Sequence, residues 1–233
     1  MASSPPPRLS IVVPALNEAP VIEDALARLQ PLRCRGHELI LVDGGSHDDT
    51  SRLAAPLVDR LMRSPRGRAC QMNAGAAAAR GDVLLFLHAD TELPRDADAL
   101  VAAALGSAAV IWGRFDVRLS GHHPLLRMVE RLMNLRSLLS GIATGDQAIF
   151  VRRDCFRSVG GFPELPLMED IAFSRTLKAI ARPVCVGTPV VTSSRRWEGH
   201  GILSTILLMW RLRLAYALGA DPRGLARAYE RGG

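Results

Sequence analysis

Short apolar runs alternate with segments of helical spacing along the first half of the chain. Residues 9–13, 39–42 and 83–87 are mainly apolar runs of strand length, and 57–62 is a candidate third strand. Apolar residues within 21–29 recur every three or four positions, and 68–80 is an alanine-rich helical segment. This alternation predicts an α/β fold with a mostly parallel central sheet flanked by helices.

The second half of the chain is less regular but continues without a break. Gly219 and Pro222 are expected to end an amphipathic final helix at 202–218. No internal repeat or long linker is visible, so residues 9–233 are predicted to form one domain after a disordered, proline-containing lead at 1–8. The other predicted helices are 97–105, 125–139, 169–180 and a short one capped by Asp154, and the predicted strands are 109–119, 147–151 and 183–192.

The composition is that of an ordinary globular protein with an excess of arginine. Of the 233 residues, 48% are hydrophobic and 22% charged, and 29 basic against 23 acidic side chains give a formal charge of +6. Lys178 is the only lysine, and arginine suits phosphate groups through its planar, permanently charged fork. No segment interleaves clustered cations with aromatic residues, so we expect no nucleic-acid partner.

The cysteines are too scattered to predict a zinc site or a disulfide framework. Residues 1–7 contain no apolar run, so neither a signal peptide nor an anchor is expected there. Both observations favour the reduced cytoplasm. The four cysteines are Cys34, Cys70, Cys155 and Cys185.

Polar clusters follow three of the predicted strands, at residues 14–18, 43–46 and 88–90. In open α/β sheets, ligands bind in the crevice outside the carboxyl ends of the strands. If the strands are parallel, the three clusters converge on one crevice. Each cluster taken singly is also compatible with turn chemistry, because Asp, Asn and Gly are favoured in turns.

The ordered set of motifs resembles family 2 glycosyltransferases with the GT-A fold, a fold of nucleotide-diphospho-sugar transferases. The resemblance extends over about residues 9–197. The versions of the motifs at 88–91 and 192–197 are similar to a subgroup known as the radical-SAM/selenodomain-associated glycosyltransferases. The motifs that carry it are Ile-Val-Val-Pro at 11–14 with Asn17 and Glu18, Val-Asp-Gly-Gly-Ser at 42–46, residues 67–75, His-Ala-Asp-Thr at 88–91, Gly-Gly-Phe-Pro-Glu at 160–164, Glu169–Asp170 and Arg196–Trp197.

The resemblance implies a nucleotide pocket built by the first half of the chain. Asp43 would accept a hydrogen bond from the base. Arg68 would lie near the phosphates at the start of its helix, where free backbone N–H groups also favour anions. The helix at 68–80 can equally be one that packs on the sheet through its alanines. The other residues assigned to the pocket are Pro14, Asn17, Glu18 and Asn73.

Asp90 matches the last acid of the Asp-x-Asp metal motif of the family, which implies Mn²⁺ or Mg²⁺ bound to the diphosphate. His88 replaces the first acid of that motif. His88 is therefore a candidate metal ligand, with contact to the ribose or simple packing as alternatives. His200 is a further candidate ligand, and a solvated position is its alternative. For Asp90 the alternative is a cap before Pro94.

Glu169 and Asp170 match the acidic pair that carries the general base in inverting members of the family. We assign the base to Asp170 and an orienting role to Glu169. Both acids can instead simply stabilise the N-terminus of the helix that starts there. Arg196 would meet the diphosphate and Trp197 would stack on a sugar, or either would be filler in the core or on the surface.

These residues together predict metal-dependent, inverting transfer of a sugar from a nucleotide-sugar, with a UDP-sugar as the expected donor. The acceptor, a small or lipid-linked molecule, cannot be identified from the sequence. A non-catalytic nucleotide-sugar-binding protein is the first alternative. A nucleotidyltransferase is the second, but its glycine-rich basic loop is missing at 14–18.

The final helix leaves three alternatives open. Arg211 and Arg213 interrupt its apolar run, so it is not predicted to span a membrane. It packs against the domain, lies on an anionic membrane at the inner face, or contacts a second subunit.

Overall fold

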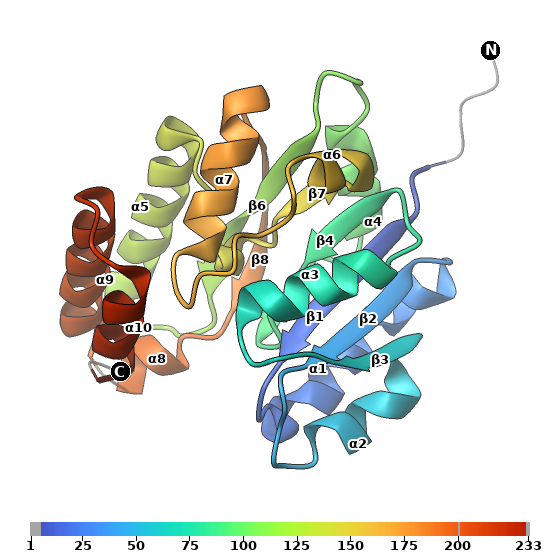
Figure 1. Cartoon of the computed structure of the whole chain (residues 1–233), viewed down its shortest axis with the longest axis horizontal. Coiled ribbons are helices and arrows are strands. Elements are labelled where there is room, and N and C mark those ends of the chain that lie inside the picture. The colour runs from blue at the N-terminus through green and yellow to red at the C-terminus, as the bar shows by residue number, and fades with distance from the viewer. Residues whose placement is uncertain (1–5, 200, 232–233) are drawn as a thin grey trace.

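The computed structural model describes residues 6–199 and 201–231. Within them, one eight-stranded sheet has the order β3-β2-β1-β4-β7-β6-β8-β5, with helices on both sides (Figure 1). The first half of the chain contributes, in order, β1 (Leu9–Ala15), α1 (Ala19–Cys34), β2 (Glu38–Asp43), α2 (Thr50–Ala54), the 3-10 turn η1 (Ala55–Leu57), β3 (Arg60–Arg63), α3 (Arg68–Ala78) and β4 (Val83–Phe86).

The second half completes the sheet and adds a group of helices at one side of the molecule. Figure 1 shows α9 and α10 on the left, on the opposite side from β3 and α2. The elements are β5 (Thr91–Glu92), α4 (Ala97–Ala104), β6 (Trp112–Leu119), α5 (Pro124–Ser140), the 3-10 turn η2 (Gly145–Gln147), β7 (Phe150–Arg152), α6 (Arg153–Ser158), α7 (Glu169–Ile180), β8 (Val184–Thr192), α8 (Arg195–Gly199), α9 (Ile202–Ala217) and α10 (Pro222–Arg231).

The sheet is mixed, although most of its strands run in one direction. β1 is parallel to β2 and β4, β2 is parallel to β3, and β6 is parallel to β8. β7 runs antiparallel to both β4 and β6, and β5 runs antiparallel to β8. The predicted α/β fold with a mostly parallel sheet is confirmed, and β7 and β5 are the strands that run against the rest.

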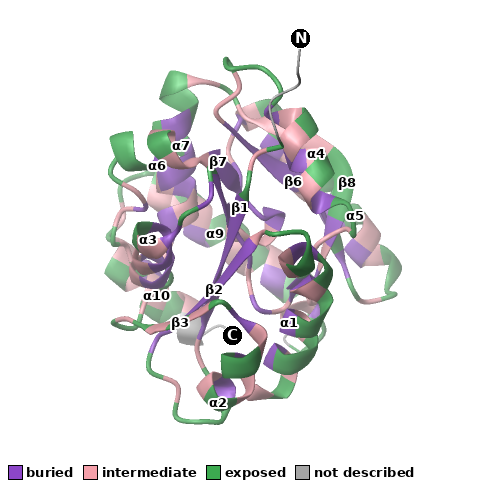
Figure 2. Cartoon of the chain, turned by 90° about the vertical axis from the view of Figure 1, so that its right-hand side faces the viewer, coloured by how far each residue is buried: buried purple, intermediate pink, exposed green. Residues whose placement is uncertain are grey.

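The centre of the sheet is buried on both faces, as Figure 2 shows for β1 and β2. Leu9, Ile11 and Val13 of β1 pack with α1 on one face, and Val12 packs with α3 on the other. The runs are therefore continuously apolar rather than alternating. α3 lies so close to β1 that a Cβ at Gly75 would overlap the Val12 side chain.

Several elements depart from the sequence-based expectation. The helix at 202–218 is not the last one, because Pro222 begins a further helix, α10. At the first position of a helix the missing N–H of proline costs no helical hydrogen bond. Residues 145–147 form a 3-10 turn and the strand starts only at Phe150. The short strand β5 and the helix α8 had no predicted counterpart.

The two last helices form a small core of their own with α7. Leu212 of α9 and Leu225 of α10 pack with Met168 and Ile171. This packing brings the end of the described chain beside the N-terminus of α7. Among the described residues, no helix has the length and apolar character needed to cross a membrane.

Candidate active site

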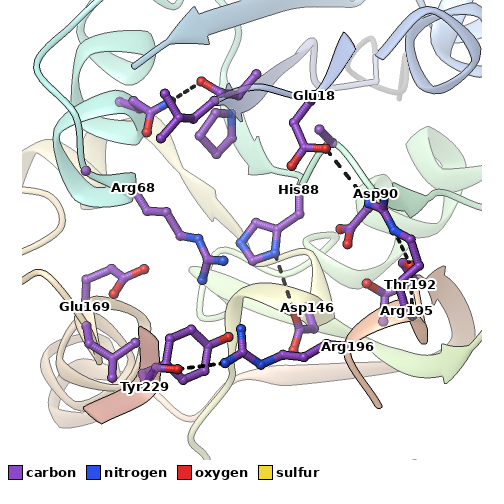
Figure 3. A pocket seen from close by; sticks show the side chains of 18 of the residues that line it. Glu18, Arg68, His88, Asp90, Asp146, Glu169, Thr192, Arg195, Arg196 and Tyr229 are labelled. Atoms are coloured by element: carbon purple, nitrogen blue, oxygen red, sulfur yellow. Dashed lines mark hydrogen bonds and ion pairs between the residues drawn. The ribbon is translucent and has the colours of Figure 1, made fainter. Parts of the chain in front are cut away.

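A cavity of about 530 Å³ opens beyond the carboxyl ends of β1 and β4. One wall comes from the loops after these strands and from the start of α3, and the facing wall comes from residues 192–197, α9 and α10 (Figure 3). Predicted residues that line it are Pro14, Glu18, Arg68, His88, Asp90, Glu169, Arg196 and Trp197.

Glu18 and Asp90 place two carboxylates close together on the strand-end wall. Burial, followed by the negative charge of Asp90, raises the pKa of Glu18 above its usual value. Arg195 acts in the opposite direction, with its guanidinium 3.9 Å from the Glu18 carboxylate. A cation between these carboxylates would relieve their repulsion.

Arg68 is the first residue of α3 and points into the cavity (Figure 3). Gly67 precedes it with φ 138°, a conformation that a residue with a side chain rarely adopts. Burial alone would lower the pKa of Arg68, but the negative charges of Glu169, Asp146 and Asp170 raise it. The cation is therefore stabilised by the negative charge of these three acids.

His88 is linked to Asp170 through the turn η2. Its Nδ1 lies 3.4 Å from the carboxylate of Asp146. The neighbouring Gly145 donates its backbone N–H to Asp170 Oδ2 at 2.9 Å. Gly145 also has no room for a side chain, because a Cβ there would come within 2.5 Å of the His88 ring.

Asp146 is charged under the influence of these neighbours. Burial alone would raise its pKa, but the hydrogen bond with His88 and the positive charges of Arg68 and Arg213 lower it. Asp146 lines the cavity, although no sequence motif pointed to it.

Glu169 and Asp170 begin α7 but occupy different surroundings. Glu169 is buried and lines the main cavity; burial and then the charge of Asp170 raise its pKa to about 7. Asp170 is half-buried and borders an adjoining cavity of about 10 Å³ next to His88 and Phe162. The predicted pair is therefore at the site, with only Glu169 on the wall of the main cavity.

Arg196 and Trp197 are held in place by neighbouring helices. The Arg196 guanidinium stacks on the Tyr229 ring, 3.6 Å from its centroid, and donates to the Tyr229 carbonyl oxygen at 3.0 Å. Trp197 packs against Leu126 and Val129 of α5. Both side chains reach the cavity, and α10 fixes the position of the first.

Asp43 is not among the residues that line the cavity, and its contact with the base stays a prediction. Its side chain is fully buried and accepts hydrogen bonds from Ser46 N, Ser46 Oγ and Ser51 Oγ. Burial alone would raise the pKa of Asp43, but these hydrogen bonds, with the charge of Arg63, lower it. The carboxylate organises the 44–51 loop in this structure.

Asn17 and Asn73 also lie away from the cavity wall. Asn17 has φ 55° and accepts the His47 backbone N–H at 2.9 Å, so it supports the same loop as Asp43. Asn73 binds both the N–H and the carbonyl of Phe162, at 2.9 and 2.8 Å. Asn73 thus holds the loop before α7 against α3, and its contact with a ligand stays a prediction.

The carboxylates at this site suit a hard divalent cation whose coordination is completed by oxygens of a bound ligand and by water. Among residues 6–199 and 201–231, no group of three His, Cys, Asp or Glu side chains forms a ready metal site. Mg²⁺ commonly uses one or two carboxylates with phosphate oxygens and water, which fits Asp90 with Glu18 beside it. His88 is engaged by Asp146, and His200 lies outside the described residues.

The structure adds lining residues that the sequence-based prediction missed. Arg66 lies two residues before the predicted Arg68, and Arg195 lies one residue before the predicted Arg196, within the 192–197 motif. Tyr229 was missed because α10 was not predicted. Gln71 stands in the 67–75 motif but was not assigned to the site: buried in α3, it donates to the carbonyls of Ala15 and Val42 and joins the ends of β1 and β2.

Comparison with known proteins agrees with this geometry. Residues 10–157 match the family model Glycosyl transferase family 2. The chain is 36% identical over 172 residues to the PGL/p-HBAD biosynthesis glycosyltransferase of Mycobacterium bovis, covering 67% of this chain and 63% of that protein. The match thus spans less than two thirds of that relative.

Solved structures with low sequence identity share the fold. The mannosyltransferase PcManGT from Pyrobaculum calidifontis, in complex with GDP-Man and Mn²⁺, has a TM-score of 0.65 and 22% identity, covering 96% of this chain and 69% of that chain. S. aureus TarS 1–349 in complex with UDP-GlcNAc has a TM-score of 0.64 and 18% identity, covering 80% and 58%. None of these matches tests the resemblance to the radical-SAM-associated subgroup, which stays a prediction.

Proposed function

The chain belongs to glycosyl transferase family 2, and from this membership we propose that it transfers a sugar from a nucleotide-sugar to an acceptor hydroxyl or phosphate. The observation that carries the proposal is the single 530 Å³ cavity, which is lined by both cations and acids. A nucleotide diphosphate needs positive charge, and sugar transfer needs a proton acceptor. The four lining arginines are Arg66, Arg68, Arg195 and Arg196.

We propose a UDP-sugar as the donor. The complex of TarS with UDP-GlcNAc supports this choice, whereas PcManGT binds GDP-Man, so support from the fold extends to nucleotide-sugars in general. The diphosphate would lie between Arg68 and Arg195–Arg196, which approach the cavity from opposite walls. In this position both walls would contribute to its binding.

A divalent metal would be held by Asp90, with Glu18 beside it. When bound, it would supply positive charge to the diphosphate leaving group. Mn²⁺ in the PcManGT complex supports a divalent metal for proteins of this fold. Loading of the site would also favour ionised Glu18, whose pKa is otherwise raised by burial and by Asp90.

We assign the general base to Asp170 in an inverting, single-displacement reaction. The Gly145 N–H orients its carboxylate, and the adjoining small cavity leaves it open beside His88. In this reaction the acceptor oxygen attacks C1 from the face opposite the diphosphate while Asp170 takes its proton. Glu169 would set the charge next to Asp170 and orient the acceptor.

The experiment that tests this assignment compares Asp170→Asn with Glu169→Gln and Asp90→Asn. We expect Asp170→Asn to keep nucleotide affinity and to lower transfer by about 100-fold or more, the usual contribution of a positioned base. Glu169→Gln should keep part of the activity, and Asp90→Asn should weaken metal-dependent nucleotide binding. The measurements are calorimetric titration with UDP and Mn²⁺, and release of UDP from a panel of UDP-sugars.

Two results would change the proposal. Full transfer by Asp170→Asn combined with loss in Glu169→Gln would move the base to Glu169. Tight nucleotide binding with neither sugar transfer nor slow hydrolysis of the donor would identify a binding protein in place of an enzyme.

A further inference from the structure

Helices α5 and α9 expose rows of large apolar side chains to solvent. The exposed fractions range from 44% for Met128 to 79% for Leu218. A single exposed leucine is common on protein surfaces, whereas a continuous group usually marks a contact with a partner or a membrane. We call this group the apolar face; it consists of Met128, Leu132, Leu135 and Leu139 on α5 and Leu203, Leu207, Trp210, Leu214 and Leu218 on α9 and its C-cap.

The two rows lie on one side of the molecule. α5 and α9 run side by side, since Val129 of α5 packs in one cluster with Ile206 of α9 (Figure 1). At 3.6 residues per turn, each row lies on its helix opposite the side that bears the buried Leu126 or Leu212. Both helices bury that side against the rest of the domain, so both rows are exposed to solvent on this side of the molecule.

The charge on these helices is positive. Among the described residues of α5 and α9 there are five arginines and one acid, Glu130. Glu130 is buried and paired with Arg127 at 2.9 Å, so it adds no exposed negative charge. Arg131 and Arg211 remain exposed beside the apolar face.

We propose that the apolar face docks on an anionic lipid bilayer. Helices that lie in a membrane interface combine leucine and tryptophan on one side with arginine nearby, and each basic residue adds attraction to anionic lipid. Trp210, 71% exposed at the middle of α9, has the amphipathic ring that favours the headgroup level. Since none of the described helices is suited to crossing a membrane, the contact is with the bilayer surface.

Charge also argues against a second copy of this chain as the occupant. A symmetric dimer joins the same patch on both subunits. It would bring Arg131 and Arg211 of the two copies together, with no exposed acid on either helix to pair with them. An anionic surface has the complementary charge.

Helix α9, which carries part of the apolar face, also lines the candidate active site through Thr205 and Met209. Arg136 of α5 and Arg213 of α9 interact electrostatically with each other and with Asp146 and Asp170. Burial and the charge of Arg213 lower the pKa of Arg136 to about 10. Docking would therefore place the acid-containing side of the cavity close to lipid head groups; this consequence rests on the proposed function, whereas the docking itself does not.

The test is flotation of the full chain with vesicles of phosphatidylcholine alone or mixed with phosphatidylglycerol. We expect binding to the mixed vesicles only. Leu207→Gln should lower the vesicle partition coefficient by about tenfold, and Leu207→Gln with Trp210→Gln by roughly 100-fold. The matched control is Leu61→Gln on β3, an exposed leucine on the opposite side of the molecule, which should bind as the unaltered chain does.

Charge is tested separately with Arg131→Gln combined with Arg211→Gln. This variant should lose about 25-fold in partitioning at low salt, and added salt should weaken the unaltered chain in the same direction. Thermal melting and UDP binding, measured on every variant, show that the fold and the nucleotide site are intact.

Three results would overturn the proposal: an unaltered chain that stays with the buffer in the presence of mixed vesicles, equal partitioning of the Leu207 and Leu61 variants, or a dimer in sedimentation analysis that Trp210→Gln converts to a monomer. A folded chain that binds vesicles but transfers no sugar would leave the docking intact and reject the proposed function alone.

Discussion

At the scale of single residues, the site depends on acids whose charge is controlled by their neighbours. Glu169 is buried next to Asp170 and opposite Arg68, and its pKa is raised to about 7. Asp146 has the opposite shift, because His88 and nearby arginines stabilise its ionised form. Near neutral pH the cavity therefore contains one acid that is partly protonated, Glu169, and one that is charged, Asp146.

The raised pKa of Glu169 makes folding stability depend on pH. In the unfolded chain Glu169 loses its proton near pH 4.5, whereas in the folded chain it keeps the proton up to about pH 7. The free energy of unfolding therefore falls as pH rises from about 4.5 to about 7 and stays lower above that. Glu169→Gln removes the free-energy cost of ionising a buried carboxyl group. We expect it to stabilise the protein by up to about 3 kcal/mol at pH 8, with the difference disappearing near pH 4.5.

Urea unfolding across this pH range measures the effect. Glu164→Gln, an exposed position in the loop before α7, is the matched control and should show a small difference at every pH. A Glu169→Gln difference that does not vary with pH would contradict the assigned shift.

Gly145 gives a second prediction at this scale. A Cβ at this position would overlap the His88 ring, while the adjacent turn holds Asp170. Gly145→Ala should therefore displace His88 or η2 and lower the rate of transfer by about tenfold or more, at a stability cost of about 1–3 kcal/mol.

Transfer rates and thermal melting of Gly145→Ala measure this prediction. Gly187→Ala is its control, because a Cβ at Gly187 meets nothing within 4 Å. Equal rates for the two variants would show that the contact between Gly145 and His88 has no role in catalysis.

At the scale of elements, α10 positions a residue of the cavity through one stacked pair. Tyr229 supports the Arg196 guanidinium by its ring and its carbonyl oxygen. Tyr229→Ala removes the ring, whereas Tyr229→Phe keeps it. We expect Tyr229→Ala to weaken UDP binding by about fivefold, in line with a cation–π contact of about 1 kcal/mol, and Tyr229→Phe to bind UDP normally.

Calorimetric titration with UDP distinguishes the two variants. If Tyr229→Phe weakened binding as much as Tyr229→Ala, the hydroxyl would be responsible in place of the ring. Unchanged affinity in both would show that Arg196 does not contact the diphosphate.

At the scale of the whole molecule, the sequence predicted what depends on hydrophobic pattern and strand direction. The parallel strands β1, β2 and β4 bury continuous apolar runs, so their boundaries and shared edge followed from the pattern. Pro14, Glu18, His88 and Asp90 then reach one cavity because these residues follow parallel, adjacent strands.

The rest could not be predicted because it depends on packing between distant segments. Asp146 enters the site through a turn before an antiparallel strand, which has no periodic signal. Asp43 lies at the expected strand end, but its carboxylate accepts hydrogen bonds from Ser46 and Ser51 and is not among the residues that line the cavity. The sequence motif specifies the residue type at each position, whereas local hydrogen bonds decide where the side chain points.

The distance in sequence between the two walls of the cavity has a consequence for biosynthesis. The strand-end wall is formed by residues 14–90, whereas Arg196 and Tyr229 belong to segments translated much later. Chains emerge from the ribosome N-terminus first, and their early segments begin to fold before the later ones exist. A nascent chain of this protein would therefore carry half of a binding cavity until α10 has been made, so the donor can assist only the last stage of its folding.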